Sequence, residues 1–303
     1  MKHIKTISEF HEYTNLPQPN HPLISVINVA DAHPDSHGGN SEHLILDFYS
    51  IAVKRMHNVK VKYGQQPFDF NEGVMSFMSP KQVFSMTADN KDKEVKKSGW
   101  AIYIHTDFIW NTSLAKTINN YDFWGYTLNE ALFLSEKEEE TINHIIQNIK
   151  KETRSNIDKF TKHIIISQIE TLLNYADRFY SRQFITREKS NHQILKDFEV
   201  LINDYFNREN LIDVGLPTVQ HIAQQLNVSP KYLSSLFQML TGQTTQQLIH
   251  DKLIEKAKEK LSTSQLTISE ISYSLGFEHI QSFSKLFKIK TNLSPKEFRQ
   301  SFN

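Results

Sequence analysis

Two helical patterns near the C-terminus place lysine, glutamine and serine side chains on the side opposite their apolar residues. The outward positions of the first pattern are Lys231, Ser234, Ser235 and Gln238. Those of the second pattern are His279, Gln281, Ser284, Lys285 and Lys288. Ammonium, amide and hydroxyl groups donate hydrogen bonds to phosphate oxygens and to base edges, so both faces have the chemistry that contact with a nucleic acid requires.

Each polar face lies on the second helix of a predicted helix-turn-helix unit, over residues 218–240 and 267–290. In the first unit, Ser229 and Pro230 supply an N-cap and a first-turn proline for the second helix. In the second unit, Thr267 and Glu270 form a capping box, and Gly276 supplies the turn. Both units therefore carry the helix starts and turns that the motif needs.

The two units repeat one pattern. The first part recurs 49 residues later, as Thr218, Ile222, Leu226 and Val228 and then Thr267, Ile271, Leu275 and Phe277. After one inserted residue the second part recurs 50 residues later, as Leu233, Leu236, Phe237, Thr241 and Thr244 and then Phe283, Leu286, Phe287, Thr291 and Ser294. A plain helical bundle would explain one such pattern, but the duplication with two polar faces favours a pair of recognition helices.

A predicted helix over residues 245–261, without Gly or Pro, separates the two units. At about 1.5 Å per residue it spans roughly 25 Å. This is close to the distance of about 34 Å between successive major grooves of duplex DNA. One chain can therefore present two recognition helices to adjacent turns of one duplex.

Three C-terminal segments resemble the signature of the AraC/XylS family of transcription regulators. They are Gly276-Phe277, the run QSFSKLFK at 281–288, and the run LSPKEFR at 293–299. The resemblance implies double-stranded DNA as the partner, control of transcription with activation as its expected direction, and contact with RNA polymerase. Two positions depart from the family pattern, because Asn292 stands where glycine is common and Ile289 where a basic residue is common.

The resemblance also assigns roles to the polar residues. It implies base contacts from Lys231, Ser234 and Ser235 in the first unit and from Gln281, Ser284 and Lys285 in the second. It implies phosphate contacts from Gln238, His279, Ser282 and Lys288.

The N-terminal part is rich in short β-type runs, including 44–53, 74–78 and 100–105. Residues 70–82 and 104–108 resemble the cupin-like sensor domains of AraC-type regulators, which implies a barrel that binds a small-molecule effector and helices that pair subunits into a homodimer. We therefore expect an α+β chain. A sensor and dimerisation domain at 1–180 has its β-rich part at 20–110 and its helices at 135–180, a linker follows at 181–191, and an all-α DNA-binding domain occupies 192–303. The candidate effector-binding residues are Trp100, Tyr103, His105 and Trp110.

Charge and composition fit this division. The 303 residues have zero net charge, but ten basic and six acidic residues follow Gly215, which gives that segment a net charge of +4. Without cysteine the chain forms no disulfide. No run approaches the roughly 20 apolar residues that span a bilayer, so we expect a cytoplasmic protein without a membrane partner.

Two other function classes are compatible with the sequence. A cupin-type metal-dependent enzyme would need clustered histidines, whereas here the histidines of the β-rich part are scattered and form no His-x-His pair. They are His21, His33, His37, His43, His57 and His105. We predict no metal, no cofactor and no catalytic residue. The other class is a regulator that recruits partners without sensing an effector.

Overall fold

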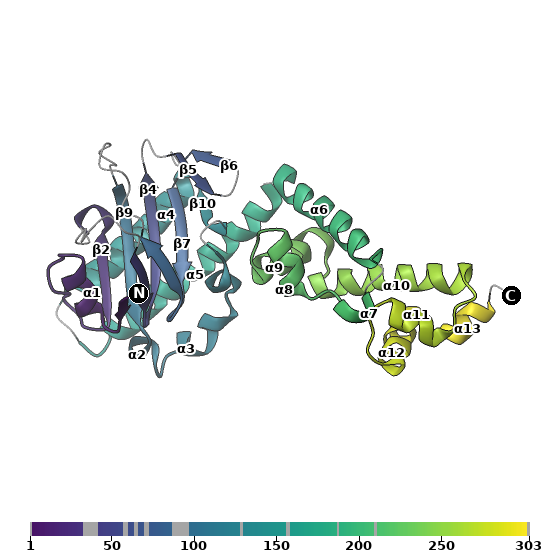
Figure 1. The fold of residues 1–303 in the computed structure, drawn as a ribbon. Coiled ribbons are helices and arrows are strands. Elements are labelled where there is room, and N and C mark those ends of the chain that lie inside the picture. The colour runs from purple at the N-terminus through teal and green to yellow at the C-terminus, as the bar shows by residue number, and fades with distance from the viewer. Residues whose placement is uncertain are drawn as a thin grey trace. The chain divides into compact units, whose positions relative to one another are not determined.

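The structure, a computed structural model, describes residues 2–32, 42–56, 60–63, 66–69, 73–86, 97–127, 130–155, 158–186, 188–208 and 211–301. The chain divides into two compact units, residues 1–183 and 184–303. The first unit combines mainly antiparallel sheets with helices, and the second is entirely helical in its described residues (Figure 1). The predicted α+β class is confirmed. Within the described ranges, no helix is long and apolar enough to cross a membrane.

Two main sheets form the first unit. The larger is antiparallel, with the strand order β10-β7-β4-β9-β2 (Leu132–Leu134, Gly73–Met78, Phe48–Met56, Lys97–His105 and Ile24–Asn28). The smaller has the order β1-β3-β8 (Lys2–Ile4, Glu42–Leu46 and Val83–Met86), and β5 and β6 (Lys60–Tyr63 and Gln66–Asp69) form a separate pair. The predicted β-run 44–53 is interrupted at Asp47, so that its two parts join different sheets.

Strand alternation gives the larger sheet two buried faces. On one face Ala52 and Tyr103 join Leu44 and Leu46 of the smaller sheet in one apolar cluster. Helix α1 (Ile7–Tyr13) adds Phe10, whose ring centroid lies 4.4 Å from that of Tyr103. The cluster therefore lies between the two sheets, where both bury their apolar side chains.

The opposite face of the larger sheet is covered by helix α4 (Glu136–Glu152), which contacts β2, β9 and β10. A capping box of Ser135 and Glu138 starts this helix. Its isoleucine side chains are all buried within the chain, namely Ile142, Ile145, Ile146 and Ile149. The resemblance implied that the helices at 135–180 pair subunits, but these side chains already cover the sheet and are not available for that role.

Helix α5 (Thr161–Thr186) follows α4 and also buries most of its apolar residues, among them Ile165, Ile169 and Leu172. Ile164 and Phe160, which immediately precedes the helix, are 44% and 57% exposed. Ile157, within the range 135–180 in which helices are predicted, lies outside the described residues. Shorter helical turns between β9 and β10 are α2 (Thr106–Ile109), α3 (Leu114–Thr117), η2 (Ile118–Asn120) and η3 (Asp122–Gly125), and η1 (Val29–Asp31) follows β2.

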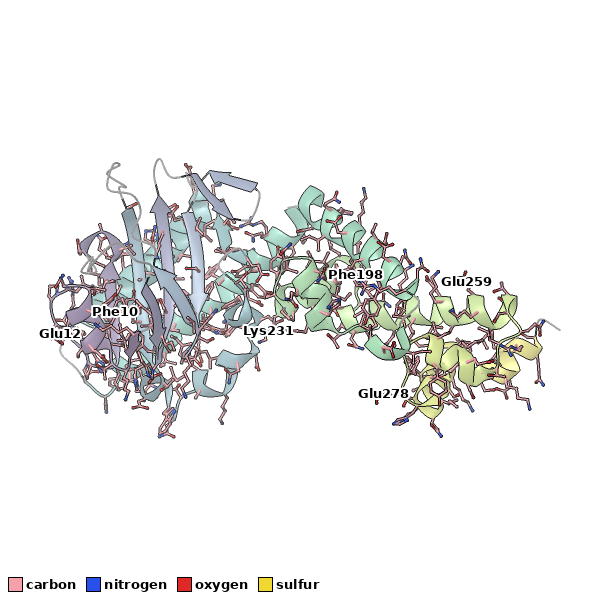
Figure 2. The ribbon with its side chains drawn as sticks, in the orientation of Figure 1. Phe10, Glu12, Phe198, Lys231, Glu259 and Glu278 are labelled. Atoms are coloured by element: carbon pink, nitrogen blue, oxygen red, sulfur yellow. The ribbon has the colours of Figure 1, made fainter. Side chains whose placement is uncertain are left out.

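The interval predicted as a linker, 181–191, is helical wherever the structure describes it. Residues 181–186 end α5 and residues 188–191 begin α6 (Glu188–Phe206). The interval is polar, which is typical of a linker, but it is rich in Arg, Gln, Glu and Lys, which are good helix formers, and it has no Gly or Pro. In residues 184–303, Phe198 of α6, labelled in Figure 2, packs edge-on against Phe237, with ring centroids 4.9 Å apart.

Candidate nucleic-acid interface

The first helix-turn-helix unit consists of α8 (Val219–Gln225) and α9 (Pro230–Thr241). Thr218 caps α8 by accepting a hydrogen bond from the His221 amide, and Ser229 caps α9 by accepting one from the Tyr232 amide, at 3.1 Å in both cases. Four residues of α9 are buried against the rest of the unit, namely Tyr232, Leu233, Leu236 and Phe237. The caps fix where α9 starts, and the buried side fixes which of its residues face outward.

The second helix-turn-helix unit consists of α11 (Ile268–Ser274) and α12 (Ile280–Thr291). The predicted capping box of Thr267 and Glu270 is present. Gly276 has a φ of +87°, and a Cβ atom there would lie 2.9 Å from the backbone of Gly215, so the turn requires glycine both for its conformation and for its close contact. Gly215 follows α7 (Leu211–Val214), which packs on α11.

The repeat seen in the sequence is also a repeat of backbone conformation. Left-handed residues occur at Asn227 and Gly276, 49 residues apart, with φ values of 55° and 87°. They occur again at Gly242 and Asn292, 50 residues apart, with φ values of 73° and 60°, where each ends a recognition helix. The structure thus places the single inserted residue between the first turn and the second helix, where the sequence comparison placed it.

On α12 the polar residues are open to solvent. Gln281, Lys285 and Lys288 are exposed, Ser284 is half-buried, and all four lie on one side because their spacing is three, four and seven residues. No hydrogen bond or ion pair within the described part of the chain occupies the side chains of Gln281, Ser284 or Lys285. His279, the residue before α12, makes no capping bond with its side chain, and Ser282 is exposed. This face is free to donate hydrogen bonds to a partner.

The equivalent face of α9 is partly used within the protein. Lys231 is exposed and Ser235 is half-buried, as expected for an outward side. The Ser234 hydroxyl lies 3.3 Å from the hydroxyl of Thr245, at the start of helix α10 (Thr245–Thr263), and therefore points toward that helix. The Gln238 amide donates to the Gly242 carbonyl at 2.9 Å and closes the end of α9. In the second copy Pro295 replaces Thr245, so Ser284 has no such partner.

A link between α10 and α12 was not foreseen from the sequence. Lys290 donates to one oxygen of Asp251 at 2.6 Å, and Gln243 donates to the other at 2.7 Å. Burial alone would raise the pKa of Asp251, but these hydrogen bonds and the charge of Lys290 hold that pKa below its ordinary value. Because the partners are 39 residues apart, no local pattern predicts the pair. It fixes the second recognition helix to the helix that separates the two units.

Comparison with known proteins places this region in a family. A family model described as a helix-turn-helix domain matches residues 222–301. The arabinose operon regulatory protein of Escherichia coli is 36% identical over 81 residues, which cover 27% of this chain and 28% of that protein. Residues 222–301 belong to the AraC-type helix-turn-helix family. The resemblance predicted from the sequence is confirmed for this domain.

Two further proteins are similar to part of this chain. An uncharacterized HTH-type transcriptional regulator in the cgkA 5′ region of Pseudoalteromonas carrageenovora is 33% identical over 116 residues, 38% of this chain and 64% of that protein. The solved C-terminal domain of the two-component response regulator yesN of Fusobacterium nucleatum is 32% identical, with 33% of this chain and 96% of that chain covered and a TM-score of 0.29. The chain covers less than two thirds of the length of the full-length relatives named here.

The AraC-type domain tolerates both departures from the family pattern. Asn292 adopts the left-handed conformation that glycine usually supplies, with a φ of 60°, as an asparagine at a helix end can. Ile289 is 65% exposed, so burial does not require an apolar residue at this position.

Outside the AraC-type domain, the four candidate effector-binding residues are not brought together. Trp100 and Tyr103 lie on opposite faces of β9, Trp100 beneath the Lys150 ammonium at 4.1 Å and Tyr103 in the core between the sheets. His105 caps α2 by accepting a hydrogen bond from the Asp107 amide, and Trp110 is 65% exposed. Positions 100 and 103 differ by an odd number, three, so alternation along a strand places the side chains of Trp100 and Tyr103 on opposite faces. Within the described ranges, no three His, Asp or Glu side chains cluster as metal ligands would.

Proposed function

We propose that this protein is a transcription regulator that binds specific DNA sequences through its two helix-turn-helix units. The observation that carries the proposal is the pair of equivalent polar faces at 231, 234, 235 and 238 and, 50 residues on, at 281, 284, 285 and 288. Helix α10 has 19 residues and is about 28 Å long at 1.5 Å per residue, which suits two recognition helices in successive major grooves.

The two faces divide the contacts. On α12, Gln281, Ser284 and Lys285 read base edges, with Lys suited to guanine and Gln to adenine. His279, Ser282 and Lys288 contact phosphates. On α9, Lys231 and Ser235 face the bases, whereas Ser234 and Gln238 are held by Thr245 and Gly242 and contribute less than the resemblance implied.

Selection from a library of randomised DNA duplexes tests the proposal with the full chain. We expect one enriched sequence with two short conserved blocks about one helical turn apart, because each recognition helix reads one block. An AraC-type protein with a known site serves as the control and must enrich that site under the same conditions. If no sequence is then enriched by this chain above its level in the starting library, sequence-specific binding is refuted.

Three further parts of the proposal concern the whole protein. Residues 1–183, which contain the segments that resemble cupin-like sensor domains, respond to a small-molecule effector. RNA polymerase is the partner through which the regulator acts, with activation as the expected direction. A protein that controls transcription works where the DNA is, so the cytoplasm remains its proposed location.

A second copy of the chain is the proposed partner of an exposed apolar surface on the first unit. Trp110, Phe160 and Ile164 are 65%, 57% and 44% exposed. Lys162, which lies between the last two, donates to the Trp110 carbonyl at 3.0 Å and so holds the two segments together. With the stripe of α4 buried, this surface takes over the predicted role in forming a homodimer.

A further inference from the structure

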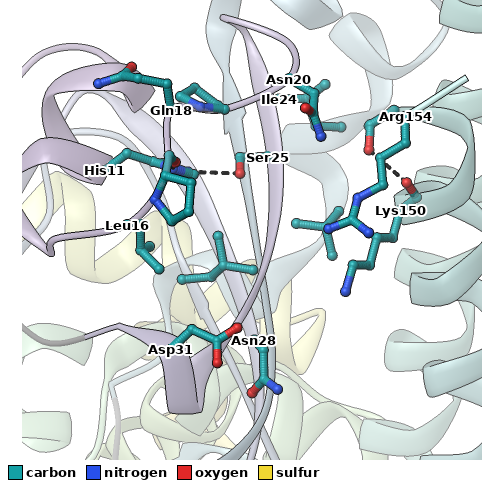
Figure 3. A pocket seen from close by; sticks show the side chains of 15 residues that line it. His11, Leu16, Gln18, Asn20, Ile24, Ser25, Asn28, Asp31, Lys150 and Arg154 are labelled. Carbon is teal, nitrogen blue, oxygen red and sulfur yellow. Dashed lines mark hydrogen bonds between the residues drawn. The ribbon is translucent and has the colours of Figure 1, made fainter. Parts of the chain in front are cut away.

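A pocket of about 500 Å³ lies at the free edge of the larger sheet. Its walls are β2, the loop of residues 16–20 that precedes it, Asp31 of η1, and the C-terminal end of α4 (Figure 3). A volume of this size suits a small metabolite. None of the four effector residues chosen from the sequence lines it.

The pocket carries an excess of positive charge. Lys150 in the last turn of α4 and Arg154, two residues beyond the end of that helix, extend toward β2 in Figure 3, and Asp31 is the one acidic residue of the lining. No ion pair or side-chain hydrogen bond occupies Arg154 within the described part of the chain. Burial and the charge of Arg154 lower the pKa of Lys150, and Asp31 opposes this only in part. An anion between the two cations would relieve their repulsion.

The edge of β2 adds backbone donors and acceptors. The Leu23 carbonyl accepts from the His105 amide at 2.9 Å, and Ser25 and Ile27 face Tyr103 and Ala101 in the same register. Because backbone groups alternate in an antiparallel pair, those of Val26 point away from β9 toward the pocket. Since β2 is the last strand of the sheet, no neighbouring strand pairs with that edge in the described structure.

A neutral, fixed histidine closes the other side. The His11 Nδ1–H donates to the Pro17 carbonyl, which can only accept, and in the neutral ring Nε2 carries no proton and accepts from the Ser25 hydroxyl at 2.9 Å. Burial lowers the pKa of His11, in agreement with this neutral state. The wall opposite Arg154 is therefore rigid and uncharged.

We propose that this pocket binds a small organic carboxylate, whose oxygens contact Arg154 and Lys150 and whose remaining polar atoms meet the edge of β2. The planar guanidinium of Arg154 matches a carboxylate with two parallel hydrogen bonds. Such a ligand would be the effector of the regulator, a role that rests on the proposed function. The binding itself does not depend on it.

Calorimetry and thermal-shift measurements on the full chain without DNA test the proposal. The probes are sodium benzoate, succinate and citrate, with inorganic phosphate as a fourth arm and sodium chloride to equalise ionic strength. We expect at least one carboxylate to bind, and Arg154→Gln to weaken it at least about tenfold. Lys151→Gln, which removes an exposed charge next to Lys150 in the sequence but outside the pocket lining, should bind as the wild type does.

Three results would overturn the carboxylate site: no binding of any carboxylate probe, binding of phosphate alone, or equal losses in Arg154→Gln and Lys151→Gln. DNA binding by the same preparations, measured without probe, separates this proposal from the proposed function. A chain that binds a carboxylate but no specific DNA would keep the pocket and refute the regulator. The reverse outcome would refute the pocket alone.

Discussion

Lys285 and Lys288 lie one turn apart on α12, and both are exposed. Lys285 is beside Gln281 and Ser284 at the centre of the polar face, whereas Lys288 is near the end of the helix. We predict that Lys285→Ala changes the preferred base at one position, at a cost of about 1–3 kcal/mol there. Lys288→Ala should weaken binding to all sequences alike. It should also reduce, by about one unit, the slope of the logarithm of the binding constant against the logarithm of salt concentration.

Binding isotherms on a set of single-base variants of the enriched duplex, at several salt concentrations, distinguish these effects. Uniform losses from both substitutions would show that neither lysine reads a base.

The serines at equivalent positions should behave differently. Ser234 faces Thr245 at 3.3 Å, whereas no hydrogen bond in the described structure occupies Ser284. We expect Ser234→Ala to lower the free energy of unfolding by about 0.5–1.5 kcal/mol and to leave base preference unchanged. Ser284→Ala should alter base preference without changing stability. Urea unfolding and the same duplex set measure both quantities, and a reversed pattern would contradict the assigned orientation.

At the scale of elements, alanine substitutions at two glycines distinguish the cost of backbone strain from the cost of a steric clash. Gly242 and Gly276 both have positive φ, but an added Cβ meets nothing within 4 Å at Gly242 and backbone at 2.9 Å at Gly276. Gly242→Ala should therefore cost about 1–2 kcal/mol, the penalty of the left-handed conformation. Gly276→Ala should lower the free energy of unfolding by clearly more than Gly242→Ala does, because α7 or the turn must move to make room for the added Cβ. Equal losses in urea unfolding would show that the contact with Gly215 is unimportant.

The link from α12 to α10 predicts a dependence on pH. The pKa of Asp251 is held below its ordinary value in the folded protein, so its contribution to stability is present above the unfolded pKa of about 3.9 and disappears as pH falls through the lower folded pKa. Both side chains are partly exposed, so the contribution is less than about 1 kcal/mol.

Urea unfolding of the wild type and Asp251→Asn should accordingly differ at pH 7 and converge in acid below about pH 4. Glu255→Gln on the same helix controls for the loss of one negative charge. A difference that persists unchanged into acid would contradict the role of this carboxylate.

For the whole molecule, the exposure of each isoleucine side chain determines whether it can contribute to a dimer interface. Ile146 is 1% exposed and Ile164 is 44% exposed. We predict that Ile146→Asp unfolds the first unit, because it buries an unpaired charge at a cost of several kcal/mol. Ile164→Asp should stay folded and shift a dimer toward monomer. Circular dichroism and sedimentation velocity measure the two effects. A wild-type chain that is monomeric at micromolar concentration would refute the homodimer.

The C-terminal architecture was predictable because its signals are local. Caps such as Thr267 with Glu270 lie within one turn, and the repeat reveals its own register. Contacts between residues distant in the sequence have no local sequence pattern and could not be predicted. The contacts of Ser234 with Thr245 and of Lys290 with Asp251 depend on how the helices cross. In the first unit the apolar stripe of α4 indicated a surface to be buried but not its partner, and the pocket at β2 assembles segments from four elements that share no motif.

Sequence-specific binding by the paired units is tested most directly by two dissociation constants for the full chain. One is for the enriched duplex and the other for a shuffled duplex of the same composition, both at about 150 mM salt so that phosphate contacts do not dominate. We predict that the enriched duplex binds at least about 1,000-fold more tightly. Equal dissociation constants would contradict the account, because the polar faces of α9 and α12 would then bind DNA without reading it.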